Sequence, residues 1–212
     1  MIIGITSRNL ASNNGPLKGV PYTYISSLND ATFQIIDSDL KLTDDNKKYI
    51  NRLLSLVDGV ILPGGDKISE IDDYIISYCY KYDIPLIGIC LGMQEIASHF
   101  SSPIKKIGSS IHYNFSAPYL HYINIDENSY MYKIIKDKRI AVNSRHNYKI
   151  ERNDNYDVMA VSDDNIIEAI KVKNTYYMVG YQFHPEVMEK YDLYAKLLFK
   201  DFINQIKKVT RD

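Results

Sequence analysis

Short apolar runs alternate with amphipathic segments along most of this chain. An apolar run bounded by turn residues predicts a buried strand, and apolar residues repeating every three or four positions predict a helix packed by one face. In the first half, strands are expected at residues 1–6, 32–36, 59–62 and 85–89, and helices at 21–28, 43–57, 69–82 and 94–100. Thr43 is a suitable N-cap for the second of these helices.

The second half continues the alternation with more strands. They are expected at residues 119–125, 139–143, 157–161, 166–172 and 176–181, before a final amphipathic helix at 191–206. The polar stretch 7–19 has no clear period and predicts a loop that could form the rim of a substrate site. The whole pattern predicts an α/β fold with a doubly wound, mostly parallel sheet of the flavodoxin type. Ligands of such sheets bind beyond the carboxyl ends of the strands.

Length and composition favour one soluble domain that acts on a small molecule. The chain has 212 residues, 45% of them hydrophobic, without a repeat or linker, so we expect a single domain over residues 1–212. Its 25 Lys and Arg residues nearly balance 26 Asp and Glu residues, which argues against nucleic acid or a membrane as partner. Two unpaired cysteines, no membrane-length apolar run and no basic leader predict a cytoplasmic protein. Nothing in the pattern indicates an oligomeric state.

The strongest chemical signal is Gly88-Ile89-Cys90-Leu91-Gly92, at the end of the predicted strand 85–89. In a nucleophile elbow, a strand turns sharply into a helix and presents the nucleophile at the edge of the sheet. A side chain at either glycine would collide with neighbouring backbone in such a turn. The following helix would favour the Cys90 thiolate and direct N–H groups, including that of Leu91, at an oxyanion. Taken alone, the segment fits a buried structural cysteine equally well.

A base and its orienting partner come from His184-Pro185-Glu186, after the predicted strand 176–181. Pro185 favours extended backbone at His184, and residues i and i+2 of an extended chain point to the same side. The Glu186 carboxylate is therefore expected to reach one nitrogen of the His184 ring, which leaves the other to take the Cys90 proton. We predict a catalytic triad of Cys90, His184 and Glu186.

Together with Pro63-Gly64-Gly65 after the strand 59–62, these segments resemble a class I glutamine amidotransferase domain, which uses a Cys-His-Glu triad. The run Val-Asn-Ser-Arg-His at 142–146 is similar to the Asn-Ser-x-His run typical of the gamma-glutamyl hydrolase branch, peptidase C26, which includes gamma-glutamyl-GABA hydrolases. The resemblance covers nearly the whole chain. It implies the flavodoxin-like class I glutamine amidotransferase fold.

The resemblance also implies roles for further residues. The oxyanion hole would combine the N–H of Leu91 with that of Gly64 or Gly65, although Pro-Gly-Gly also makes a simple tight turn. Gln94 would line the pocket for the glutamyl group. Residues Ser144, Arg145 and His146 would hold the α-amino and α-carboxylate groups of the substrate. The implied chemistry needs no metal or organic cofactor.

The remaining histidines receive no catalytic role. His99 lies on a predicted helix and fits a packed or capping residue. His112 and His121 lie in an extended region, where a metal site would need further ligands at suitable spacing. None is apparent, so no metal is expected, and Glu168 is given only a structural role.

These residues favour hydrolysis of the gamma-glutamyl amide bond of a small compound, with release of glutamate and an amine through a glutamyl thioester on Cys90. The elbow sequence also resembles glutaminase subunits, which deliver ammonia from glutamine to a separate synthase, and this alternative requires a protein partner. A third alternative is a non-catalytic relative, against which the intact Cys, His and Glu argue. Residues 7–20 and 102–120 would select the leaving group.

Overall fold

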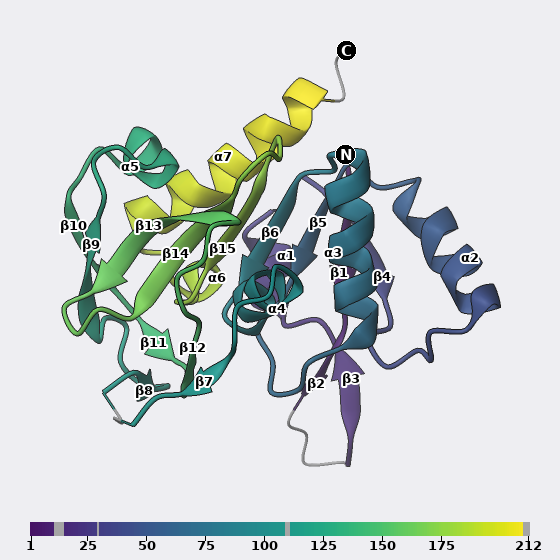
Figure 1. Cartoon of the computed structure of the whole chain (residues 1–212). Coiled ribbons are helices and arrows are strands. Elements are labelled where there is room, and N and C mark those ends of the chain that lie inside the picture. The colour runs from purple at the N-terminus through teal and green to yellow at the C-terminus, as the bar shows by residue number, and fades with distance from the viewer. Residues whose placement is uncertain (11–14, 29, 109–110, 210–212) are drawn as a thin grey trace.

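A nine-stranded sheet forms the centre of the computed structural model, which describes residues 1–10, 15–28, 30–108 and 111–209 (Figure 1). In spatial order its strands are β10 (Arg139–Val142), β9 (His121–Ile125), β13 (Tyr156–Ser162), β14 (Ile167–Val172), β15 (Met178–Tyr181), β6 (Leu86–Ile89), β5 (Gly59–Leu62), β1 (Ile2–Thr6) and β4 (Thr32–Ile36). Pairing is parallel from β15 to β4 and antiparallel from β10 to β15. Within this sheet only β9 and β14 run against the rest, which confirms the predicted α/β fold with a mostly parallel sheet.

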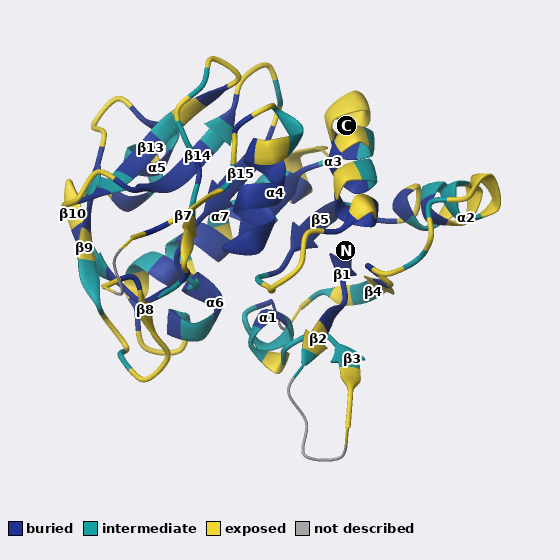
Figure 2. Cartoon of the chain, turned by 60° about the horizontal axis from the view of Figure 1, so that its bottom comes forward, coloured by how far each residue is buried: buried dark blue, intermediate teal, exposed yellow. Residues whose placement is uncertain are grey.

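The register of the central strands brings their carboxyl ends to one edge. Leu62 at the end of β5 lies beside Gly88 of β6, and Ile89 at the end of β6 lies beside Tyr181 at the end of β15. All three strands are buried along their whole length, and Figure 2 shows this for β5 and β15. The segments that follow them therefore meet at a fixed place.

Helices cover both faces of the sheet. One face carries α1 (Tyr22–Ser26), α5 (Tyr130–Ile135), α6 (Pro185–Met188) and α7 (Leu193–Val209), and the other carries α2 (Asp44–Leu54), α3 (Glu70–Tyr82) and α4 (Leu91–His99). Alternate residues of β5 serve the two cores: Ile61 packs in the cluster that includes Phe202 of α7, and Val60 packs in the cluster that includes Ile75 of α3. Among the described residues, no helix has the length and apolar character needed to cross a bilayer.

The predicted helix boundaries follow from local capping. The Thr43 hydroxyl accepts the Asn46 N–H at 3.3 Å, which confirms Thr43 as an N-cap, and Ser69 caps α3 in the same way. Helices α5 and α6 were not predicted. They have six and four residues, too few to display a helical period in the sequence.

Three two-stranded sheets lie outside the main sheet: β2 (Arg8–Leu10) with β3 (Leu17–Gly19), β7 (Lys105–Lys106) with β12 (Tyr148–Lys149), and β8 (Tyr113–Asn114) with β11 (Ser144–Arg145). The first of these shows that the prediction of a loop over residues 7–19 is wrong in part, because strands of three residues are too short for visible alternation. Residues 11–14, and residues 109–110 of the other expected selectivity segment, lie outside the described residues.

Candidate active site

Cys90 lies at the sharp turn between β6 and α4. Its backbone adopts φ 52° and ψ −103°, which residues with a side chain rarely occupy. The Cys90 N–H donates to the Tyr181 carbonyl at 2.7 Å, and the Cys90 carbonyl accepts the Gln94 N–H at 3.1 Å. The local geometry is that of a strand–turn–helix elbow with Cys90 at the turn.

Gly88 and Gly92 occupy positions without room for a side chain. A Cβ on Gly88 would lie 2.6 Å from the carbonyl carbon of Gly92, and a Cβ on Gly92 would overlap the carbonyl of Leu62. Strands β5 and β6 and helix α4 can therefore approach so closely only because both residues lack a side chain. This is the steric reason predicted for the two glycines.

His184 lies beside Cys90 because β15 and β6 are neighbouring parallel strands. Nδ1 of His184 is 2.7 Å from Oε1 of Glu186. The contact is as expected, but the route to it differs: Glu186 reaches the ring from the first turn of helix α6, not from extended chain. Pro185 begins this helix at its first position, where the missing N–H has no helical partner to lose.

Asn143 fixes the backbone of His184 and was not predicted to do so. Its Nδ2 donates to the His184 carbonyl at 2.8 Å, and its Oδ1 accepts the His184 N–H at 2.8 Å. Asn143 directly follows β10 and is fully buried. The edge strand β10 thereby helps to position a residue that follows β15.

The surroundings of His184 favour its protonated form. Burial alone would lower the pKa of His184, but the Glu186 carboxylate and the Cys90 side chain beside the ring together raise it to about 10. At neutral pH the ring therefore carries protons on both nitrogens. Because Nδ1 faces Glu186, Nε2 is the nitrogen available to Cys90.

Gly64 packs directly against this pair. A Cβ on Gly64 would lie 2.8 Å from Cε1 of His184 and 3.5 Å from Cβ of Cys90. The Gly64 N–H donates to the buried Tyr24 hydroxyl at 2.9 Å, so it already has a partner. Gly65 instead lines the same cavity as Cys90 and Leu91. Of the two expected glycines, the geometry favours Gly65 as an oxyanion donor.

A buried ion cluster supports the loop that carries these glycines. Arg8 donates to the Pro63 carbonyl through Nε at 3.3 Å and Nη2 at 3.0 Å. It also pairs with Asp72 of α3 at 2.5 Å and with Glu95 of α4 at 3.2 Å. Burial and the nearby Asp72 carboxylate raise the pKa of Glu95 to about 9. Arg8 thus joins β2, α3 and α4 behind the loop, a role that its place in the expected loop did not indicate.

A cavity of about 270 Å³ opens at Cys90. Its lining consists of Gly65, Asp66, Cys90, Leu91, Gln94, Tyr113, Arg145, His146, Asn147 and Tyr148. Gln94 is almost fully buried, and its Nε2 donates to Oε1 of Gln182 at 3.2 Å and to the Tyr148 carbonyl at 3.4 Å. The fold therefore brings Gln94 and Arg145 to the cavity that Cys90 faces.

The segment 144–146 reaches this cavity only in part. Ser144 is fully buried, and its hydroxyl donates to the His112 carbonyl at 2.7 Å, so it does not line the cavity. Arg145 does line it, with Nη2 donating to the Phe115 carbonyl at 3.1 Å. Both ring nitrogens of His146 face protein atoms, at 3.0 Å from the Tyr148 carbonyl and 3.5 Å from Glu168. Arg145 is the member of the segment that can offer charge to a ligand.

The reason for expecting no metal is wrong. His112 and His121 do have further ligand-type neighbours, because the fold brings His146 and Glu168 to them. The four residues come from separate segments, and no spacing in the sequence relates them. His99 instead pairs with Asp73 at 2.7 Å on the protein surface.

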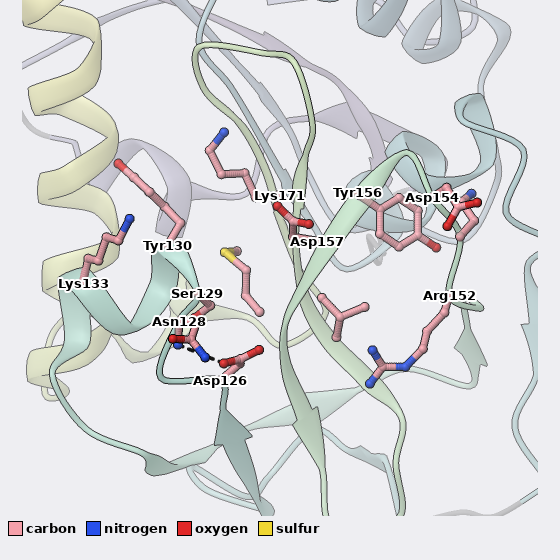
Figure 3. A pocket seen from close by; sticks show the side chains of 13 residues that line it. Asp126, Asn128, Ser129, Tyr130, Lys133, Arg152, Asp154, Tyr156, Asp157 and Lys171 are labelled. Atoms are coloured by element: carbon pink, nitrogen blue, oxygen red, sulfur yellow. Dashed lines mark hydrogen bonds between the residues drawn. The ribbon is translucent and has the colours of Figure 1, made fainter.

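A larger cavity of about 820 Å³ lies away from Cys90, among residues of α5, β13 and β14 (Figure 3). Side chains of both charges line it, among them Asp126, Lys133, Asp157 and Lys171. None of the predicted site residues belongs to its lining. Size alone therefore does not identify the reactive cavity.

The comparisons with known proteins identify the family of this chain. The family model of Peptidase C26 matches residues 69–186, which include Cys90, His184 and Glu186. The chain belongs to the Peptidase C26 family and contains a glutamine amidotransferase-like domain, which confirms the resemblance drawn from its motifs.

The proteins that are similar in sequence are longer than this chain. The chain is 27% identical to a CTP synthase of Levilactobacillus brevis over 84% of this chain and 39% of that protein. It is 33% identical to a glutamine-hydrolyzing GMP synthase of Sulfurimonas denitrificans over 72% of this chain and 29% of that protein. The chain thus spans well under half the length of these relatives.

Solved structures share the fold. The glutaminase domain of a CTP synthase from Trypanosoma brucei, with bound acivicin, superposes with a TM-score of 0.75 at 18% identity, covering 98% of this chain and 94% of that chain. A glutamine amidotransferase from Thermotoga maritima gives a TM-score of 0.60 at 15% identity, covering 100% of this chain and 86% of that chain. The predicted glutamine amidotransferase fold is confirmed.

Proposed function

We propose that this chain is a cysteine hydrolase that cleaves the gamma-glutamyl amide bond of a small compound and releases glutamate and an amine. The observation that carries the proposal is the convergence of His184 and Cys90 on Gly64, with Glu186 bonded to the His184 ring at 2.7 Å and Cys90 lining a cavity. We further propose that the whole chain acts as one domain. Because the chemistry requires a reduced thiol and both cysteines are free, we place it in the cytoplasm.

The proposed reaction begins with attack of the Cys90 thiolate on the side-chain carbonyl of the glutamyl group. The N–H groups of Leu91 and Gly65 would stabilise the oxyanion, since the Gly64 N–H is engaged by Tyr24. His184 then protonates the departing amine, and a glutamyl thioester remains on Cys90. The same ring next takes a proton from water, which hydrolyses the thioester, while Glu186 keeps the ring oriented.

Substrate contacts are proposed for two of the polar residues that line the cavity. Arg145 can pair with the α-carboxylate of the glutamyl group, and Gln94 can bond its polar atoms. A volume of about 270 Å³ suits a small ligand and not a polypeptide segment. Ser144 and His146 would support the segment 144–148 and not touch the substrate.

A second candidate is a glutaminase that supplies ammonia from glutamine to a separate synthase. It is favoured by the sequence relatives, which are named CTP synthase and GMP synthase and extend far beyond the part that matches this chain. In this case a synthase would be the partner, and the substrate would be glutamine itself. The same three residues would perform the chemistry.

Glutamate release by the purified chain distinguishes the two candidates. The substrates are glutamine and a panel of gamma-glutamyl amines, and Cys90→Ala is the blank, with its thermal unfolding compared to show that it folds. We expect release from at least one amine that disappears in Cys90→Ala. Release unaffected by that substitution would overturn the mechanism. If no gamma-glutamyl amine yields glutamate, and glutaminase activity appears only when a synthase binds, the second candidate is established instead.

A further inference from the structure

Four side chains from four segments converge beside the candidate active site. They are His112, His121 at the start of β9, His146 after β11, and Glu168 in β14, and one ligand atom of each lies within 4.8 Å of all the others. The cluster adjoins the site, since the Gln182 N–H donates to the Glu168 carbonyl at 2.8 Å and His146 also lines the cavity of Cys90.

The distances from the three rings to Glu168 are close to those between ligands of a tetrahedral ion. Nδ1 of His112, Nε2 of His121 and Nε2 of His146 lie 3.6, 3.6 and 3.5 Å from the same atom, Oε1 of Glu168. Ligands about 2.0–2.1 Å from a tetrahedral Zn²⁺ are separated from one another by about 3.3–3.4 Å. The three separations exceed this value only slightly.

All of these atoms lack a hydrogen-bond partner among the residues that the structure describes. They include the three ring nitrogens and both carboxylate oxygens of Glu168, which is fully buried. A buried carboxylate without a donor is strongly unfavourable, and native structures rarely contain one. A protonated histidine would satisfy it at hydrogen-bond distance, but all three separations are longer than a hydrogen bond.

The opposite nitrogen of each ring does have a partner. Nε2 of His112 is 3.0 Å from Asp164, Nδ1 of His121 is 3.2 Å from the Tyr122 carbonyl, and Nδ1 of His146 is 3.0 Å from the Tyr148 carbonyl. These partners only accept hydrogen bonds, so each outer nitrogen carries the hydrogen. The inner nitrogen of a neutral ring then presents its lone pair to the centre of the cluster, as in metal-binding histidines.

We propose that His112, His121, His146 and Glu168 bind one divalent transition-metal ion, with Zn²⁺ the expected occupant. Three imidazoles and one carboxylate are ligands that Zn²⁺ accepts in tetrahedral geometry. The side chains of His112, His146 and Glu168 are at most 1% exposed, so the site is closed and structural, and the 15% exposed side chain of His121 marks the entry path. The ion would anchor the segment 144–148, and with it one wall of the reactive cavity, to β9 and β14.

Metal uptake by the full chain tests the proposal. The protein is stripped with a chelator, dialysed, and titrated with Zn²⁺ alone, while bound metal is measured by mass spectrometry and the unfolding midpoint by calorimetry. Co²⁺ is titrated in parallel, because its visible absorption reports four-coordinate geometry. All measurements are repeated in Cys90→Ala, so that binding to the reactive thiol is excluded.

Two ligand variants and one control decide the outcome. His121→Gln removes the most exposed ligand and Glu168→Gln the buried carboxylate, whereas His99→Gln removes a histidine outside the cluster. We expect one Zn²⁺ per chain in wild type, Cys90→Ala and His99→Gln, and its loss in both ligand variants. At a free Zn²⁺ concentration a hundred times Kd, the folding constant should rise about a hundredfold.

Equal Zn²⁺ uptake by wild type and His121→Gln would overturn the proposal, as would uptake that disappears in Cys90→Ala. If Glu168→Gln does not fold, His121→Gln decides alone, since that side chain is partly exposed. None of these readouts depends on turnover, so the result is independent of the proposed hydrolase activity.

Discussion

Gly64 offers a direct test of how closely the reactive groups must pack. In Gly64→Ala the new Cβ would lie 2.8 Å from Cε1 of His184, while ordinary van der Waals contact begins at 3.4 Å. The neighbour here is a ring held by Glu186 on a backbone that Asn143 fixes, not the end of a flexible chain. We therefore expect the ring to be displaced from Cys90 by about half an ångström or more.

The size of the effect follows from that displacement. A misplacement of about 1 Å between reacting groups can reduce the rate about a hundredfold, which corresponds to about 2.7 kcal/mol in the activation free energy. Folding should change much less, because the Ala side chain meets one ring at the edge of the sheet. The expected signature is a large fall in kcat with a small change in the unfolding midpoint.

The assay compares wild type, Gly64→Ala and Gly108→Ala. Gly108 is a matched control, since a Cβ there would meet nothing within 4 Å. Glutamate release gives kcat and KM. The rate of Cys90 alkylation by iodoacetamide gives a second readout that remains available if the chain turns over slowly without a partner. The reasoning would be refuted by a Gly64→Ala variant whose turnover and alkylation rates both stay within about twofold of those of Gly108→Ala.

Three further predictions concern Glu186 and Asn143, the residues that position His184. Glu186→Gln removes the main charge that raises the pKa of His184 to about 10. The alkaline limb of the pH profile of kcat/KM should therefore move to lower pH. Identical pH profiles in wild type and Glu186→Gln would contradict this. The raised pKa also stabilises the wild-type fold fully below about pH 6.5, and this contribution falls as the pH rises towards 10, so the variant should show a weaker pH dependence of unfolding. Asn143→Ala leaves the N–H and carbonyl of His184 without their 2.8 Å partners and should reduce the free energy of unfolding in urea by at least about 2 kcal/mol. The half-buried Asn124→Ala is its control, and equal losses in both variants would show that the two hydrogen bonds of Asn143 to His184 are not important.

Most of the fold could be predicted because its elements carry local signals. The buried strands β5 and β6 are continuous apolar runs, and α2 and α3 begin at Thr43 and Ser69, which cap them. The hairpin of β2 and β3 and the short helices α5 and α6 could not be predicted, since each is shorter than the window in which a period becomes visible.

The residues of the candidate site also differ in whether a local signal in the sequence predicts them. Cys90 and His184 could be predicted because glycine and proline neighbours constrain the backbone beside them. Arg8, Tyr24 and Asn143 act through partners more than 39 residues away, at Pro63, Gly64 and His184. The histidine cluster illustrates the limit most clearly, because its four residues meet only after β9, β11 and β14 have taken their places.

The reactive groups and the cavity wall belong to different parts of the architecture. Cys90 and His184 follow adjacent strands in the middle of the main sheet, whereas Tyr113, Arg145 and Tyr148 belong to two-stranded ribbons outside it. Mutations in the ribbons can therefore change which ligand fits the cavity without moving Cys90 relative to His184. Residues that shape the cavity can therefore vary independently of the residues that hold Cys90 beside His184.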